Sequence, residues 1–288
     1  MIDPTEIRIK AAQAKIDPGI VEKDYVLSKA LMAMSQSEPV QQSLLFKGGT
    51  ALKKCYFPEW RFSEDLDFTG RELLKPKEIK AIFQTTTENA TQLFGIPMRV
   101  IEYSQYPKTG DKLTSAQLKL GYDGPLRKAS GQKNNIRVDI AFAEKIVSSS
   151  NSRFIHRDYT DDIDARLSVY SLEEIVAEKL RSILQRAKSR DYYDVWILLK
   201  RYKKNIVIDD TLDILKKKCE FKGITFPVVE DFFAPDLVKE AAPFWERGLG
   251  HQVDKLPAFD IVLSELRKLL VGIFEGATLC SFKEKSKG

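Results

Sequence analysis

The chain has 288 residues, of which 43% are hydrophobic and 30% are charged, and its formal net charge is +5. This composition is ordinary for a globular protein, and its 46 Lys and Arg residues permit a nucleic-acid partner without requiring one. Three scattered cysteines, Cys55, Cys219 and Cys280, have no metal-ligand spacing and imply no disulfide, which favours a reducing cytosol. No apolar run reaches membrane-spanning length and no signal-peptide pattern is present, so we expect a cytoplasmic protein with no membrane partner.

The first part of the chain mixes helix and strand patterns. Apolar residues at helical spacing predict a helix at 16–35, and a Gly-Gly turn is followed by a possible short helix at 50–56. The remaining predictions are, in chain order, a strand at 61–69, a helix at 77–94, and strands at 98–104, 115–122 and 136–142. A polar link at 124–135 would join the last two strands as a long hairpin. Together these elements predict an α+β fold with a mixed or antiparallel sheet.

After Asp164 the pattern becomes almost entirely helical. Apolar periodicity predicts helices at 172–184, 192–202, 212–218, 236–245 and 259–274. We therefore predict two domains, a core with an N-terminal helix at 1–165 and a helical domain at 166–288. The last residues, KEKSKG, are expected to form a frayed or disordered tail.

Residues 46–69, FKGGTALKKCYFPEWRFSEDLDFT, carry the most informative pattern of the chain. Asp65 and Asp67 are two positions apart in a predicted strand, so both side chains should project from one face, while Leu66 and Phe68 point into a core. Two carboxylates on one face repel each other unless a cation lies between them. Their oxygen atoms are suitable ligands for Mg²⁺, which proteins bind with one or two carboxylates plus substrate phosphates.

Gly48 and Gly49 precede this carboxylate pair. Glycine lets backbone N–H groups approach a phosphate closely, and the start of a following helix would also attract an anion. Either pattern alone is more often structural, since Asp-x-Asp is common on solvated strands and Gly-Gly is common in turns. In this order and spacing they predict transfer of a phosphoryl or nucleotidyl group.

A third carboxylate, Asp139, lies in the predicted strand IRVDIAF. An Asp within so apolar a strand is costly unless it is paired or bound. If this strand neighbours the one with Asp65 and Asp67, Asp139 would complete a three-carboxylate site able to hold two metal ions. The alternative is that Asp139 forms an ion pair with an arginine such as Arg137 or Arg153.

The segment SLEEIVAEKLRSILQRAKSRDYYDVWIL holds a second group of charged residues. At about 100° per residue, Lys179 and Arg186 lie on one face of a helix. Arg190 would extend this stripe if the helix were continuous, although Ser189 could instead cap a new helix. A lysine beside an apolar stripe usually extends to water, whereas the functional alternative is contact with a phosphate.

Two acids, Asp191 and Asp194, follow this stripe. They could stabilise the dipole of a helix start or hold the basic residues in place.

Taken together, these segments resemble the AbiEii/AbiGii toxin family of nucleotidyltransferases. These proteins are the toxin halves of bacterial type IV toxin–antitoxin and phage-abortive (abortive infection) systems, within the DNA polymerase β-like superfamily. The matching segments are VEKDYVLS (21–28), FKGGTAL (46–52), RFSEDLDF (61–68), IRVDIAF (136–142), EEIVAEKLRSILQR (173–186) and SRDYYDVW (189–196). The glycine and Asp-x-Asp motifs are shared by the whole superfamily, and the other segments narrow the resemblance to this family.

The resemblance implies a polymerase β-like core and a role for each matching residue. The triphosphate would be held by Gly48, Gly49, Thr50 and Ser63. The Mg²⁺ ligands would be Asp65, Asp67 and Asp139, with Asp139 also helping to activate the acceptor hydroxyl. Lys179 and Asp191 match downstream functional positions, with Lys179 on a phosphate. The acceptor backbone would contact Arg186 and Arg190.

We therefore expect a Mg²⁺-dependent enzyme that transfers NMP from an NTP to an RNA hydroxyl, such as a tRNA 3′ end, and so blocks translation. Its partner would be a separately encoded antitoxin protein. One alternative keeps the fold but modifies a hydroxyl on a protein or on a small molecule such as an aminoglycoside. Another is a catalytically inactive nucleic-acid-binding module, against which the full carboxylate set argues.

Overall fold

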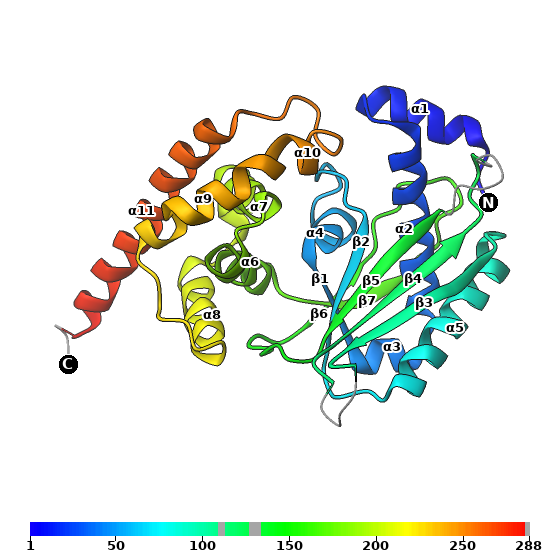
Figure 1. The fold of residues 1–288 in the computed structure, drawn as a ribbon, viewed down its shortest axis with the longest axis horizontal. Coiled ribbons are helices and arrows are strands. Elements are labelled where there is room, and N and C mark those ends of the chain that lie inside the picture. Colours follow the sequence, from blue (N-terminus) through cyan, green and yellow to red (C-terminus); the bar gives the residue numbers. More distant parts are fainter. Residues whose placement is uncertain (109–112, 127–133, 286–288) are drawn as a thin grey trace. The chain divides into compact units, whose positions relative to one another are not determined.

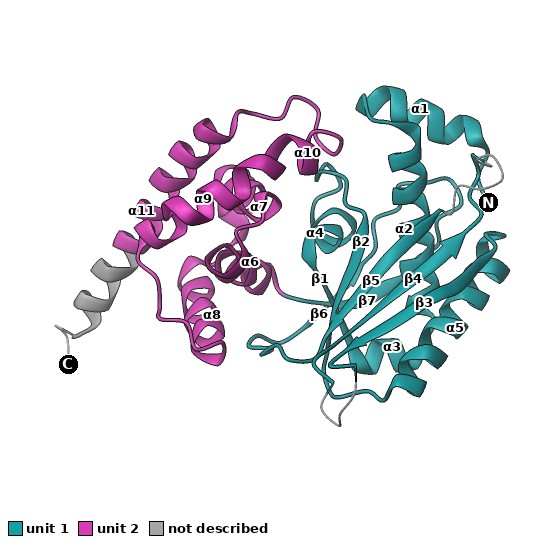
Figure 2. Ribbon diagram, viewed as in Figure 1, with its two compact units in different colours: residues 1–170 teal, residues 171–288 magenta. Residues whose placement is uncertain are grey.

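The computed structural model describes residues 1–108, 113–126 and 134–285, with side chains up to residue 275. Part of the predicted link at 124–135 and the end of the predicted tail lie outside these residues. The chain divides into two compact units, Met1–Tyr170 and Ser171–Gly288 (Figure 2). Each unit is described by itself below.

Unit 1 is built on a seven-stranded sheet with the strand order β3-β4-β5-β2-β1-β7-β6 (Figure 1). The strands are β1 Leu44–Lys47, β2 Asp65–Gly70, β3 Met98–Tyr106, β4 Ser115–Tyr122, β5 Asn135–Ala141, β6 Asn151–Phe154 and β7 Arg166–Val169. Strand β2 is antiparallel to β1 and parallel to β5, and β4 and β5 form the predicted antiparallel pair. The predicted α+β class with a mixed sheet is confirmed.

The helices of unit 1 pack on this sheet and surround its central strands. They are α1 Pro4–Ala14, α2 Pro18–Ser35, α3 Glu38–Ser43, α4 Gly48–Ala51, the π-helix η1 Leu52–Tyr56, and α5 Pro76–Phe94. Helix α2, predicted at 16–35, begins at Pro18, where the Asp17 carboxylate accepts a hydrogen bond from the Gly19 amide at 2.7 Å. Helices α2 and α5 contact each other, and α5 also contacts β3.

Unit 2 is helical in its described residues. Its α-helices are α6 Leu172–Arg186, α7 Ser189–Arg201, α8 Ile208–Phe221, α9 Pro235–Ala241, α10 Trp245–Leu249 and α11 Phe259–Lys285. Short 3-10 turns occur at Lys203–Asn205, Val229–Phe233 and Ala242–Phe244. No helix among the described residues is long and apolar enough to cross a membrane.

Several element boundaries differ from the sequence-based predictions. The strand expected from residue 61 begins only at Asp65, because the chain is still irregular after Pro58. Strand β7 lies in the part expected to be helical, and β6 was not predicted. Each of these strands has only four residues, too few for a reliable alternation of apolar and polar positions.

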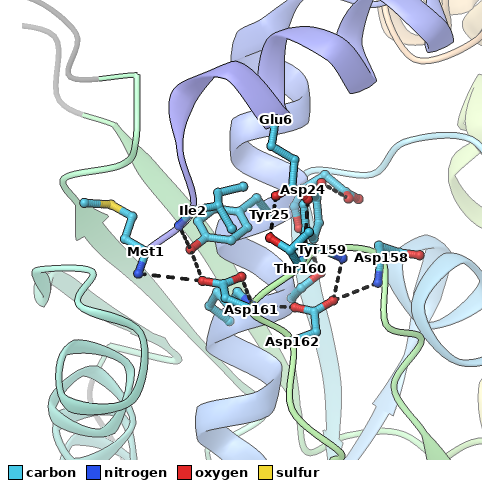
Figure 3. A network of polar contacts seen from close by, with 12 residues as sticks. Met1, Ile2, Glu6, Asp24, Tyr25, Asp158, Tyr159, Thr160, Asp161 and Asp162 are labelled. Atoms are coloured by element: carbon cyan, nitrogen blue, oxygen red, sulfur yellow. Dashed lines mark hydrogen bonds and ion pairs between the residues drawn. The ribbon is translucent and has the colours of Figure 1, made fainter.

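A buried network of charges joins α2 to η1 and to the loop at 155–165 (Figure 3). The Lys54 ammonium on η1 lies 2.6 Å from the Asp24 carboxylate on α2 and 2.9 Å from Asp158. Asp24 also accepts a hydrogen bond from the Tyr159 hydroxyl at 2.7 Å. A second lysine, Lys29 on α2, forms ion pairs with Asp161 and Asp162 of the same loop. The network therefore fixes the helix that follows the Gly-Gly turn.

Candidate active site

The paired acids of β2 share one face of the strand. Asp65 and Asp67 are partly exposed, whereas Leu66 and Phe68 between and after them are buried. This is the alternation predicted from the sequence, and it follows from the two-residue period of a strand. The ring of Phe68 packs against that of Phe46 on β1, with centroids 5.2 Å apart, so the apolar face anchors the acidic face.

The parallel pairing of β2 with β5 brings in the third acid. In this register Asp67 lies directly opposite Asp139, and Asp65 lies opposite Arg137. Asp139 therefore has the predicted position beside the Asp-x-Asp pair, despite the long separation in sequence. On the other side of β5, the Gln117 amide on β4 donates a hydrogen bond of 2.7 Å to Asp139 Oδ1.

Arg137 lies among these acids and forms an ion pair with two of them. Its Nη2 is 2.8 Å from Asp65 Oδ2, and its Nε is 2.9 Å from Asp139 Oδ2. Partial burial lowers the pKa of Arg137, but Asp65, Asp139 and Asp67 outweigh this effect, so the pKa is raised above its ordinary value. The structure thus combines the two readings of Asp139, since this acid both neighbours Asp67 and pairs with Arg137.

The other arginine considered for Asp139 has a different role. Arg153 donates from Nε to the Cys55 carbonyl oxygen at 3.1 Å, and its guanidinium lies 3.9 Å from the centroid of the Tyr56 ring.

The Gly-Gly turn packs against the acidic face. Gly48 has a φ of 80°, which favours glycine, and a Cβ at this residue would collide with Oδ2 of Asp67. A Cβ on Gly49 would lie 3.1 Å from Arg61 Nη2 and 3.2 Å from Ser63 Oγ. The glycines therefore let the backbone, the Asp67 carboxylate and the polar groups of residues 61–63 come close together.

The hydroxyl of Thr50 forms a hydrogen bond within unit 1. It donates a hydrogen bond of 2.5 Å to the Asp65 carbonyl oxygen and so ties α4 to the start of β2. The triphosphate roles of Thr50, of Ser63 and of the two glycines remain predictions.

The acid cluster has the chemistry of a magnesium site. Among the described residues, no three His, Cys, Asp or Glu side chains converge closely enough to hold a metal ion. The Arg137 guanidinium lies between Asp65 and Asp139 and supplies a positive charge there. Carboxylate oxygens are suitable ligands for Mg²⁺. The donor types of Asp65, Asp67 and Asp139 therefore suit the ion, and their arrangement with Arg137 between them places that guanidinium where a cation's charge would lie.

In unit 2, Lys179 forms a buried ion-pair cluster between two helices. Its Nζ on α6 lies 3.2 Å from Asp191 Oδ1 and 2.6 Å from Asp194 Oδ2, both on α7. Lys179 is 8% exposed and Asp194 is fully buried. The lysine thus does not extend to water, and the acids hold it in place, as one sequence reading proposed. Its contact with a phosphate remains a prediction.

The basic stripe of the sequence analysis is interrupted. Helix α6 ends at Arg186, Ala187 adopts a left-handed conformation with a φ of 38°, and α7 begins at Ser189. Of the two alternatives left open by the sequence, the continuous helix is therefore wrong and a new helix at Ser189 is right, so Arg190 does not extend the face of α6. Ser189 does not cap α7, because its hydroxyl donates to the Phe244 carbonyl oxygen at 3.0 Å. Arg186 lies 3.9 Å from Asp191 Oδ2.

Sequence reasoning named Arg137 as a possible partner of Asp139, and the two-residue period of the strand placed both side chains on one face. It missed the contact of Arg137 with Asp65, and it missed Gln117 altogether. Gln117 could not have been found in this way, because its contact with Asp139 depends on the register between β4 and β5.

The mixed sheet carries three acids on adjoining positions of two strands, beside a glycine turn. The class of protein, a nucleotidyltransferase, is shown by a family match. The family model described as "Nucleotidyl transferase AbiEii toxin, Type IV TA system" matches residues 30–265, and the chain belongs to this family of toxins. The resemblance found in the sequence is thereby confirmed.

A solved structure shares the fold. It is MenT4, a nucleotidyltransferase toxin from Mycobacterium tuberculosis H37Rv, which matches with a TM-score of 0.66 and 19% sequence identity over 95% of this chain and 90% of that chain. No curated protein matches the chain in sequence.

Proposed function

We propose that the protein is a Mg²⁺-dependent toxin that transfers NMP from an NTP to an RNA hydroxyl, such as a tRNA 3′ end, and so blocks translation in the cytoplasm until an antitoxin protein neutralises it. The observation that carries this proposal is the register of β2 and β5, in which Asp67 lies opposite Asp139 while Asp65 shares the same face. The Gly48 turn lies against Asp67, and a triphosphate would approach the acids at this turn.

Each residue of the cluster has a part in this proposal. Asp65, Asp67 and Asp139 would hold the metal, which supplies charge neutralisation for an in-line displacement at phosphorus. Asp139 would also accept the proton of the attacking hydroxyl. The backbone of Gly48 and Gly49 and the Ser63 hydroxyl would orient the triphosphate, so that positioning provides much of the rate.

The charged cluster of unit 2 supplies the remaining proposed contacts. Lys179 would bind a phosphate of the nucleotide, and the pairing with Asp191 and Asp194 fixes where its ammonium lies. An RNA acceptor is supported by the excess of basic residues, which gives a sequence pI of about 8.9. Arg186, whose side chain is 55% exposed, is available for the phosphate backbone of the acceptor.

The experiment is a transfer assay with four labelled NTPs, Mg²⁺, and separated fractions of cellular RNA and cellular protein. We expect label in small RNA, dependent on Mg²⁺ and absent with Asp67→Asn. Label confined to the protein fraction or to small molecules would overturn the RNA acceptor. The absence of label in every fraction, with folded protein, would overturn nucleotidyl transfer.

A further inference from the structure

Arg137 occupies the centre of charge of the acid cluster. It lies opposite Asp65 in the register of β2 and β5, and its guanidinium reaches both Asp65 and Asp139, at 2.8 Å and 2.9 Å. Like charges this close would repel each other strongly without a cation. In the absence of metal, the positive charge that stabilises the acidic face therefore comes from the chain itself.

The guanidinium is held there by only part of its hydrogen-bonding capacity. Its Nη2 donates a hydrogen bond to Asp65 Oδ2, whereas its Nε, 2.9 Å from Asp139 Oδ2, is poorly aligned for a hydrogen bond and interacts with that acid mainly as an ion pair. The side chain of Arg137 is also 39% exposed, so the guanidinium has a route to solvent. A group that is held mainly by charge and is open to water can leave when another cation takes its place.

We propose that Arg137 is an internal cation that competes with Mg²⁺ for Asp65 and Asp139, and that it leaves the cluster when the metal binds. Arg137 is thus a positioning residue. Its guanidinium blocks metal binding to Asp65 and Asp139 until the metal concentration is high enough, for example when the ion arrives with a nucleotide. This inference rests on the proposed function, because it requires the three acids to be the metal site.

Competition by Arg137 should change the apparent metal affinity by a measurable factor. If the guanidinium occupies the cluster about nine-tenths of the time, the apparent metal affinity is about tenfold weaker than that of the open cluster. Replacing Arg137 with a neutral residue removes this competition. It also removes one positive charge from beside Asp65 and Asp139, so the metal-free protein should become less stable while the metal-bound protein does not.

The test measures binding of Mn²⁺ alone to the full chain, from the loss of the free-ion signal in electron paramagnetic resonance, without nucleotide or acceptor. The variants are Arg137→Gln and Arg137→Lys, with Arg153→Gln as the matched control in the same unit. We expect Arg137→Gln to bind Mn²⁺ about tenfold more tightly than wild type. The Mn²⁺ affinity of Arg137→Lys should lie between those of wild type and Arg137→Gln, because a compact ammonium cannot bridge two acids as a planar guanidinium does. Arg153→Gln should not change the affinity.

A second measurement is the melting temperature with and without Mg²⁺. Mg²⁺ should raise it more for Arg137→Gln than for wild type, because the ion replaces the charge that was removed. Unchanged or weaker Mn²⁺ binding by Arg137→Gln, with binding abolished in Asp67→Asn, would overturn the competition but leave the metal site intact. The absence of Mn²⁺ binding in wild type and in every Arg137 variant would overturn the metal site, and the competition with it.

Discussion

Asp67 lies on β2 between two paired strands and against the glycine turn. It faces Asp139 across the parallel pair and Lys47 across the antiparallel pair, and it lies against the backbone of Gly48. Both neighbouring strands therefore fix its position. A residue held from two sides is a sensitive place to test the chemistry without disturbing the fold.

We expect Asp67→Asn to reduce Mg²⁺-dependent transfer on the order of 10³-fold, because a lost metal ligand costs several kcal/mol in the transition state. The melting temperature should stay the same or rise, since one like charge is removed. The control is Asp123→Asn, a surface acid 3.8 Å from Arg99. Full activity in Asp67→Asn would contradict the assignment of this residue as a metal ligand.

Asp24 provides a test of pH dependence. Burial raises its pKa, but the charges of Lys54 and Lys53 and the hydrogen bonds it accepts outweigh burial, so the pKa of Asp24 is lowered from its ordinary value. A lowered folded-state pKa gives stability that is present above the unfolded value, near pH 4, and is lost as the pH falls through the folded value. Lys54, whose pKa is raised, keeps its own contribution until the pH exceeds its ordinary value.

For Asp24→Asn we predict a loss of about 3 kcal/mol of unfolding free energy at pH 7, because Lys54 loses a buried partner. The loss should shrink as the pH falls below about 4, because the unfolded chain then takes up a proton at Asp24 before the folded protein does. Urea unfolding at a series of pH values measures both effects. Asp164→Asn, which removes an exposed acid 3.3 Å from Arg157, should change little. An equal loss at all acidic pH values would show that Asp24 does not titrate as described.

At the scale of elements, the Lys179 cluster joins α6 to α7 across the break at Ala187. We expect Lys179→Met to destabilise the fold by about 3–5 kcal/mol, because Asp194 and Asp191 are left without their buried partner. Lys200→Met is the matched control, since Lys200 pairs with Glu265 at the surface of the same helical unit and such pairs contribute about 1 kcal/mol or less.

Adding Asp194→Asn to Lys179→Met should recover part of the lost stability. Comparison of NTP binding in the folded variants then distinguishes a structural role of Lys179 from a contact with the nucleotide phosphate. If Lys179→Met weakens stability alone and leaves nucleotide binding unchanged, the lysine is structural and the proposed phosphate contact is wrong.

The elements that the sequence predicted well have a strong local signal. Helices α2 and α5 and strands β3, β4 and β5 have long periodic patterns, and the Asp-x-Asp alternation placed Asp65 and Asp67 on one face. Strands β6 and β7 are short, so their existence depends on pairing with the sheet. A break between the helices predicted at 172–184 and 192–202 was expected, but its place at Ala187 was not, because an alanine in a left-handed conformation has no sequence signature.

At the scale of the site, the sequence predicted which acids meet and offered Arg137 as a partner of Asp139, but it treated these as alternatives. The second contact of Arg137, with Asp65, depends on the register of β2 and β5, which a strand pattern does not reveal.

For the whole molecule, the candidate residues divide between the two compact units. The three acids and the glycine turn belong to residues 1–170, whereas Lys179, Asp191, Arg186 and Arg190 belong to residues 171–288. The proposed RNA contacts can therefore be tested separately from the acids.

We expect Arg186→Gln combined with Arg190→Gln to weaken RNA binding and to flatten its dependence on salt. The slope of log K against log salt should fall by about 0.7 for each lost contact with a single-strand phosphate. Lys217→Gln, an exposed lysine 3.8 Å from Asp213, controls for charge alone. A uniform loss of affinity with an unchanged slope would mean that neither arginine meets a phosphate.

The tight approach of Gly48 to Asp67 has a consequence for how such a gene changes under selection. Any single-base change in the first or second position of a glycine codon yields a residue with a Cβ or ends the chain, and here a Cβ must push the Asp67 carboxylate aside. If the activity arrests growth, cells that outlive an imbalance between toxin and antitoxin should often carry missense changes at this codon.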